Sequence, residues 1–260
     1  MNKHTSTYLL ILLIALTCSF WTSCNKIDYR TPTYSVASLN VVNALPTSAP
    51  LILGQGPISS SIGVFSGIGT LSYAGIAVLT PMSGSQTLMV LQGNADTASV
   101  TSHGGDYMFD SKLNFSAGNL YSLYITGTDT TSPDYLFIQD SVTKRTDSTV
   151  GIRFVNLSTG SNPVSVDIKG QANGSIVSNL AYKGITSFMS FPATSTISSY
   201  VFEFRDAASG NLLTSYTLSG VNTNSPTVAN SVLFRNLTIA LIGQPSGGNV
   251  AQTCIRVNSF

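Results

Sequence analysis

Apolar and polar residues alternate along short segments of this chain, and Gly, Pro, Asn and Asp recur between the segments at intervals of roughly 8–12 residues. Alternation over so few residues, with many Val, Ile, Tyr and Phe, predicts half-buried strands joined by tight turns. In the first half a strand is expected around Leu39 and Val41. Further strands are predicted at residues 71–79, 86–91, 107–115, 120–126 and 135–139, and the Gly/Ser-rich residues 54–69 predict a long loop.

The second half repeats this plan. Strands are predicted at residues 151–156, 164–169, 180–188, 200–205, 212–218, 231–242 and 253–258. Gly210-Asn211 lies between two of them and is typical of a hairpin turn.

Three pairs of segments recur in the same order. Residues 39–43 (LNVVN) with Pro50 match residues 152–156 (IRFVN) with Pro163 at a spacing of 113. Residues 71–76 (LSYAGI) match 180–185 (LAYKGI) at a spacing of 109. Asn119-Leu120 matches Asn236-Leu237, and each pair leads through an apolar strand to a glycine, Gly127 or Gly243. Similar spacings in one order indicate a duplicated domain.

The polar residues 141–149 lie between the two copies and are predicted to be a linker. Residues 36–140 then form a first domain and residues 150–260 a second, and each is long enough to bury its own core. The architecture expected from the pattern is two tandem β-sandwiches.

Composition supports an all-β fold and disfavours one class of binding partner, nucleic acids. Charged residues are 9% of the chain, and Glu203 is the sole glutamate, so the usual residues of surface helices are scarce. The net charge is +1, and Lys144-Arg145 is the only adjacent basic pair. A nucleic-acid partner is disfavoured, because phosphate binding needs clustered Lys and Arg.

The first 23 residues are predicted to be a signal peptide. Lys3 precedes an apolar run from Tyr8 to Leu16, which is shorter than the roughly 20 residues of a membrane span. Thr22-Ser23-Cys24 then resembles the lipobox of bacterial lipoproteins, although Trp21 stands where an aliphatic residue is usual. The resemblance implies lipidation at Cys24, a tether over residues 24–35 and an outer-membrane location. The alternative is an ordinary cleaved leader with a chance cysteine.

The two copies resemble the family called domain of unknown function 4397. The similarity lies in the VVN…P segment, the Tyr-Gly turn and GNLYSLYITG, and in the second copy over nearly its whole length. It implies tandem immunoglobulin-like domains on secreted or lipid-anchored envelope proteins, and it assigns no catalytic residues. The 54–69 insertion departs from the family pattern, and Arg235 is matched with Gly118.

No catalytic or metal constellation is predicted. His103 with Asp106 and Asp110 would be an acid–base or metal site, but a glycine turn entering a strand is the favoured interpretation. Asp129 and Asp134 could bind calcium through their carboxylate oxygens, but a solvated turn is the favoured interpretation of this segment. If Cys24 is lipidated, Cys254 has no partner for a disulfide and thiolate metal sites are excluded. No cofactor is expected.

Tyr121 and Tyr124 have two interpretations. They resemble the tyrosine that fixes a strand corner in immunoglobulin-like folds, which is favoured, or they stack on a sugar. Four triplets are similar to an O-glycosylation motif: those starting at Asp96, Asp129, Asp140 and Asp147.

Together these features predict a lipid-anchored envelope protein, on the cell surface or the periplasmic side, that is not an enzyme. The expected role is a surface binding, adhesion or spacer module with an unidentified glycan or protein ligand. The alternative is a pilus-type structural subunit that completes its sheet with a donated strand.

Overall fold

The computed structural model describes residues 35–47, 49–55, 70–92, 107–194, 196–221, 230, 232–245 and 250–259. The chain from Ser35 to Phe260 forms one compact unit. The described residues contain sixteen strands and no helix, so the predicted all-β fold is confirmed. Accordingly, this part of the chain has no helix that is long and apolar enough to span a membrane.

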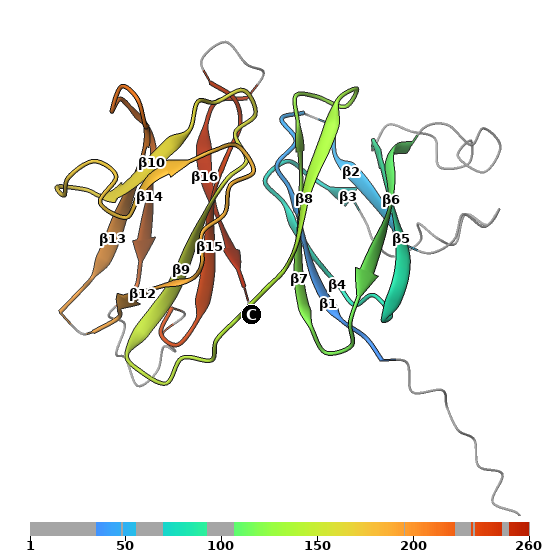
Figure 1. Ribbon diagram of the computed structural model, residues 1–260, viewed down its shortest axis with the longest axis horizontal. Helices are drawn as coiled ribbons and strands as arrows, with labels where there is room; N and C mark the ends of the chain where they lie inside the picture. Colours follow the sequence, from blue (N-terminus) through green and yellow to red (C-terminus); the bar gives the residue numbers. More distant parts are fainter. Residues whose placement is uncertain are drawn as a thin grey trace, which may run out of the picture. The chain divides into compact units, whose positions relative to one another are not determined.

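The strands of the first half form two four-stranded sheets, with the orders β4-β1-β7-β8 and β3-β2-β5-β6 (Figure 1). Apolar side chains of both sheets, among them Leu39, Leu53 and Leu123, meet in a buried core. The strands are β1 (Ser38–Asn43), β2 (Leu51–Gln55), β3 (Thr70–Leu71), β4 (Ile76–Leu79), β5 (Gly84–Gln92), β6 (Tyr107–Phe115), β7 (Leu120–Gly127) and β8 (Pro133–Gln139).

The second half has the same arrangement, with the sheets β12-β9-β15-β16 and β11-β10-β13-β14. Its core contains Phe154 and Phe202, whose rings meet edge to face at 5.2 Å between centroids. The predicted hairpin at Gly210-Asn211 is confirmed by the antiparallel pairing of β13 with β14. The strands are β9 (Thr149–Asn156), β10 (Val164–Ile168), β11 (Val177–Leu180), β12 (Met189–Pro192), β13 (Ser199–Asp206), β14 (Leu212–Ser219), β15 (Asn236–Ile242) and β16 (Thr253–Asn258).

Strand pairing confirms the repeat and corrects its register. β1 pairs in parallel with β7, and β9 pairs in parallel with β15. The amide of Ser38 donates to the carbonyl of Asn119 at 3.0 Å, and the amide of Gly151 donates to the carbonyl of Arg235 at 2.8 Å. Arg235 therefore occupies the position of Asn119, so the predicted match of Asn119 with Asn236 is wrong by one residue.

The same shift corrects the residue matched with Gly118. Gly118 has φ 74° and donates to the carbonyl of Val36, whereas Phe234 has φ 61° and donates to the carbonyl of Thr149. Phe234, not Arg235, therefore replaces Gly118. Both turns need a left-handed residue, a conformation that costs a non-glycine residue roughly 1–2 kcal/mol.

An asparagine at the end of the first strand explains why the VVN and Tyr-Gly motifs recur together. Asn43 donates through Nδ2 to the carbonyl of Leu71 at 2.9 Å, and its Oδ1 accepts from the amide of Leu45 at 3.1 Å. Its backbone also exchanges hydrogen bonds with Ala74 and Gly75. The side chain is fully buried, so it fixes a turn that would otherwise leave buried polar groups unpaired.

Asn156 makes the equivalent bonds in the second half. It donates to the carbonyl of Leu180 at 3.1 Å and accepts from the amide of Ser158 at 3.0 Å. Its backbone exchanges hydrogen bonds with Lys183 and Gly184.

The predicted strands at 71–79 and 180–188 are wrong as continuous elements. Each is interrupted by the turn just described, where Ala74 has φ 62° and Lys183 has φ 60°. The sequence pattern also did not predict β2, which includes Gly54 and Gln55 of the predicted 54–69 loop. The rest of that predicted loop falls outside the described residues.

The sheets β4-β1-β7-β8 and β12-β9-β15-β16 pack against each other through a third apolar cluster, hereafter the inter-sandwich interface. Its buried members are Val42, Ala44 and Tyr124 from the first sandwich, with Val155, Leu157, Ala240, Ile242 and Val257 from the second. Each of these sheets therefore buries side chains on both of its faces, which the expectation of two separate domains did not include.

Candidate functional site

Several predicted site residues lie outside the described residues. These are Cys24, His103 and Asp106; the side chain of Asp110 is likewise not described, although its backbone lies in β6. Within the described residues, no group of three or more His, Cys, Asp or Glu side chains is placed to hold a metal ion.

Asp129 and Asp134, the predicted alternative calcium ligands, make different contacts. The Oδ1 atom of Asp129 accepts from the amide of Thr131 at 2.7 Å, its hydroxyl at 2.6 Å and the amide of Ser132 at 3.1 Å. The hydrogen bonds from Thr131 lower the pKa of Asp129, so this carboxylate is ionised at neutral pH. Asp134 instead forms an ion pair with Lys183 of the second sandwich at 2.7 Å.

Tyr121 and Tyr124 are buried, as the structural interpretation requires. The Tyr121 hydroxyl accepts from the amide of Ser116 at 2.9 Å, and its ring stacks on Phe137. The Tyr124 hydroxyl accepts from Arg153 at 3.1 Å inside the inter-sandwich interface. Neither ring is available to stack on a sugar, because the two residues are 3% and 0% exposed.

Arg153 is the polar centre of the inter-sandwich interface. Its guanidinium pairs with Asp140 at 2.7 Å, and it donates to Thr238 at 2.7 Å and to Ser122 at 3.2 Å. Ser122 in turn donates to the second oxygen of Asp140 at 2.7 Å. Apart from one arginine inside an apolar run, no sequence pattern predicts this network, because the partners of Arg153 come from three other segments.

A second charged network lies on β10 and β13. Asp167 is fully buried opposite Glu203, and Arg205 pairs with Asp167 at 3.3 Å and also with Glu203. Burial raises the pKa of Asp167. Arg205 contacts both carboxylates and also donates to the carbonyl of Gly210, which is the geometry of a structural ion network rather than of an acid–base pair.

Cys254 is a free cysteine that packs against the core of the second sandwich. Burial raises the pKa of its thiol, so the reactive thiolate is disfavoured.

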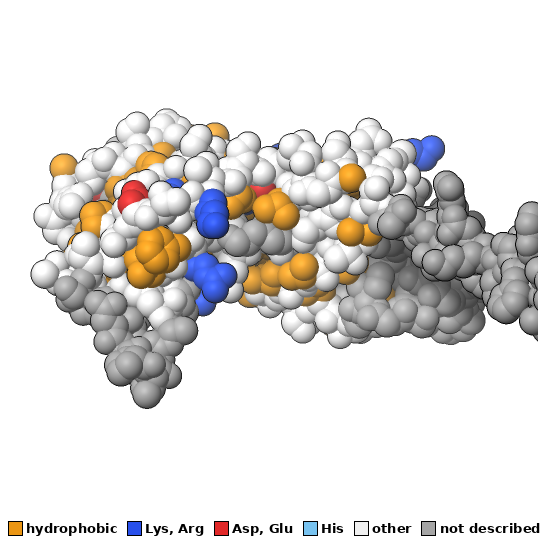
Figure 2. Space-filling model, turned by 90° about the horizontal axis from the view of Figure 1, so that it is seen from below, with side chains coloured by type: hydrophobic (Ala, Val, Ile, Leu, Met, Phe, Trp, Pro, Cys, Tyr) orange, Lys and Arg blue, Asp and Glu red, His pale blue; other side chains and the backbone are white. Residues whose placement is uncertain are grey.

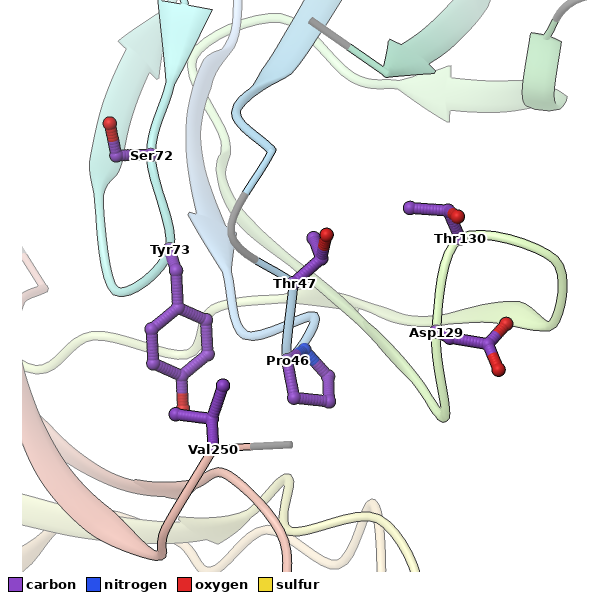
Figure 3. A pocket seen from close by; sticks show the side chains of 7 residues that line it. All are labelled: Pro46, Thr47, Ser72, Tyr73, Asp129, Thr130 and Val250. Carbon is purple, nitrogen blue, oxygen red and sulfur yellow. The ribbon is translucent and has the colours of Figure 1, made fainter. Parts of the chain in front are cut away.

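The candidate binding site is a pocket of about 610 Å³, hereafter the turn pocket (Figure 3). Its volume lies within the usual range of small-molecule sites. The first sandwich supplies most of the lining from three connections, β1–β2, β3–β4 and β7–β8, and the second supplies one residue. The lining residues are Pro46, Thr47, Ser72, Tyr73, Asp129, Thr130 and Val250.

Tyr73 is the unusual member of this lining. Its hydroxyl is buried and has no hydrogen-bond partner among the described residues. Burial raises the pKa of Tyr73 to about 12. Figure 3 shows the ring of Tyr73 pointing toward Val250. In the same view Pro46 and Thr47 lie between Tyr73 and the β7–β8 turn, and the Asp129 carboxylate points away from the tyrosine.

Charge on the molecular surface is sparse. On the face in Figure 2 most side chains are uncharged, with scattered apolar groups and a few Lys and Arg. Among the described residues, two exposed apolar side chains lie close together on β4: Ile76 is 41% exposed and Val78 is 64% exposed.

Comparison with known proteins gives one family and distant structural likenesses. The model of the family described as domain of unknown function (DUF4397) matches residues 37–169, from the start of the first sandwich through β10. A search of curated proteins finds no match.

A streptococcal virulence factor whose structure concerns alpha-glucan binding is 10% identical, with a TM-score of 0.24, over 80% of this chain and 93% of its own. An adhesin-like protein of Bacteroides ovatus is 10% identical, with a TM-score of 0.23, over 87% of this chain and 94% of its own. Likenesses this distant carry no inference about function.

Proposed function

We propose that this chain, which belongs to the DUF4397 family, is a non-enzymatic binding or adhesion module held at the outer membrane by a lipid on Cys24. The proposal keeps the predicted order: signal peptide 1–23, tether 24–35, first sandwich 36–140, linker 141–149 and second sandwich 150–260. Two or three acyl chains at one cysteine anchor a protein far more firmly than one.

The observation that carries the binding role is the way both sandwiches build one pocket. Gln244, between β15 and β16, donates to the carbonyl of Thr128 at 3.1 Å, beside Asp129. Val250 of the same connection lines the turn pocket. The buried Arg153 network and the apolar inter-sandwich interface support a fixed relation between these walls. A binding site needs walls held in such a fixed relation.

Two experiments test the proposal. Cells that express the wild type or Cys24→Ala are labelled with a fatty-acid probe and fractionated. We expect label and membrane partitioning for the wild type alone, and protection of the wild type from protease added to intact cells would place it on the periplasmic side. The detergent-solubilised protein is then applied to protein and glycan arrays. A wild type that takes up no label contradicts the anchor, and an absence of binding on both arrays contradicts the binding role.

The edge strand β4 favours a second candidate, the pilus-type subunit. Among the described strands β4 pairs only with β1, and Ile76 and Val78 leave apolar surface along it. A donated strand would cover such an edge. Val78→Lys should then abolish polymers seen by size-exclusion chromatography of the wild type, whereas a monomeric wild type removes this candidate.

A further inference from the structure

We infer that the turn pocket binds a neutral saccharide, with the Tyr73 hydroxyl and the Thr130 side chain as hydrogen-bonding groups. This inference rests on the proposed binding role and names its site and ligand class. It follows from the chemistry of the lining, from the fixed geometry of the turns and from the unpaired hydroxyl.

The lining matches a ligand with many hydroxyl groups. Thr47, Ser72 and Thr130 each carry a hydroxyl that donates and accepts, as the hydroxyls of a sugar do. The ring of Tyr73 and the pyrrolidine of Pro46 offer apolar surface to the C–H face of a pyranose. Such a mixture of hydroxyl and apolar surface suits a saccharide better than a purely apolar molecule.

Charge decides between saccharide classes. The one ionisable carboxylate in the lining is Asp129, which is ionised at neutral pH, and the seven lining residues include no Lys, Arg or His. Phosphorylated, sialylated or uronate ligands would find no cation among these lining residues to pair with, and the nearby Asp129 charge would repel them, which disfavours them. A neutral saccharide needs no such cation.

The walls of the pocket are braced before any ligand arrives. The Asp129 turn is closed by its three hydrogen bonds from Thr131 and Ser132. The Tyr73 turn is held by the buried Asn43, and the hydroxyl of Thr47 accepts from the amide of Ala49 at 3.2 Å. Preformed walls reduce the ordering cost of binding.

The Tyr73 hydroxyl gives an independent reason for a ligand. A buried polar group without a partner costs roughly 1–3 kcal/mol, so its presence beside a pocket calls for an explanation. Val250 lies toward this hydroxyl in Figure 3. A ligand hydroxyl that reaches Tyr73 from the turn pocket would accept the hydrogen bond that the described residues leave unmade.

The test uses the detergent-solubilised full chain on an array of immobilised neutral hexose and N-acetylhexosamine oligosaccharides, with sialylated and uronate-bearing oligosaccharides on the same array. We expect the wild type to bind neutral members and not the anionic ones. Tyr73→Phe and Thr130→Val should each weaken binding to the best neutral oligosaccharide by about three- to tenfold, as the loss of one hydrogen bond does. The matched controls, Tyr216→Phe and Thr217→Val on β14, should bind as the wild type does.

Each other outcome overturns a distinct statement. If the wild type binds neutral oligosaccharides and both pocket variants bind equally well with unchanged melting temperatures, the site is wrong while the binding role stands. Preference for anionic oligosaccharides overturns the ligand class. If the wild type binds proteins but no oligosaccharide, the saccharide inference fails and the proposed function survives.

Discussion

The guanidinium of Arg153 lies 2.7 Å from the carboxylate of Asp140, and their side chains are only 4% and 0% exposed. Asp140 follows the last strand of the first sandwich, and Arg153 lies in the first strand of the second. One ion pair therefore joins the two halves across a buried interface. Charges placed there must be paired, because an isolated buried charge is very costly.

Removing one member of this pair should be far more harmful than removing both. We expect Arg153→Met to lower the free energy of unfolding by about 3–5 kcal/mol, because it leaves Asp140 buried and unpaired. The double variant with Asp140→Leu should recover part of that loss. Urea unfolding at neutral pH measures all three proteins.

The second ion pair between the sandwiches is the control. Lys183 and Asp134 also lie 2.7 Å apart, but their side chains are 35% and 41% exposed. Lys183→Met should therefore cost no more than about 1 kcal/mol. A loss in Arg153→Met no larger than that in Lys183→Met would show that the buried pair does not hold the halves together.

Left-handed residues allow a reciprocal test at one position of the repeat. A Cβ at Gly118 would meet nothing within 4 Å, so Gly118→Ala should cost about 1 kcal/mol through backbone strain alone. Phe234 is 48% exposed and has the same left-handed conformation, so Phe234→Gly should be neutral or stabilising. Thermal melting measures both, and a strong destabilisation in Phe234→Gly would mean that its ring packs in a way that outweighs the strain.

Asp206 should make stability depend on acid. Hydrogen bonds from Asn162 and from the amide and hydroxyl of Ser209 lower the pKa of Asp206 from 3.8 to about 2. Since the fold favours the ionised form, this contribution is present above pH 3.8 and is lost as the pH falls through about 2. Asp206→Asn should therefore melt below the wild type at pH 6, and the difference should shrink at pH 2. An equal difference at both values would exclude the linkage.

The fold was largely predictable because strands leave a local signal. The period of two, the turn residues and the repeated VVN and Tyr-Gly motifs all act over a few residues, so the sequence carries them directly. The strand breaks at Ala74 and Lys183 were missed for the opposite reason. Neither position holds the Gly or Asn typical of a left-handed turn, and Asn43 and Asn156 stabilise these turns from other strands.

The candidate site could not be predicted, because distant segments assemble it. Pro46, Tyr73, Asp129 and Val250 each lie in a connection whose residues look like ordinary turn residues. Only the packing of one sandwich on the other brings Val250 to the first three. The same holds for Arg153, whose burial depends on partners from β7, β15 and the residue after β8.

Limited proteolysis should cut the linker at one bond and leave the two halves together. Lys144 is exposed, whereas Arg145 donates to Asn236 at 3.1 Å and also to Ser190 and Thr149. We therefore expect trypsin to cut first after Lys144, since an exposed segment with few contacts opens most easily. Mass spectrometry of the first products locates the cut, and an earlier cut within β7 would contradict the assignment of this segment as the linker.

The two products should co-elute in size-exclusion chromatography without denaturant, because the inter-sandwich interface buries apolar side chains of both halves. In nicked Arg153→Met the unpaired Asp140 weakens that interface, so its halves should separate under the same conditions. Gly151→Ala is the matched change in the linker contact: a Cβ there would clash with Oδ1 of Asn236 and with the Arg145 guanidinium, so it should expose Arg145 to trypsin and leave the halves associated. Separation of nicked wild-type halves without denaturant would show that the covalent linker, and not the interface, joins them.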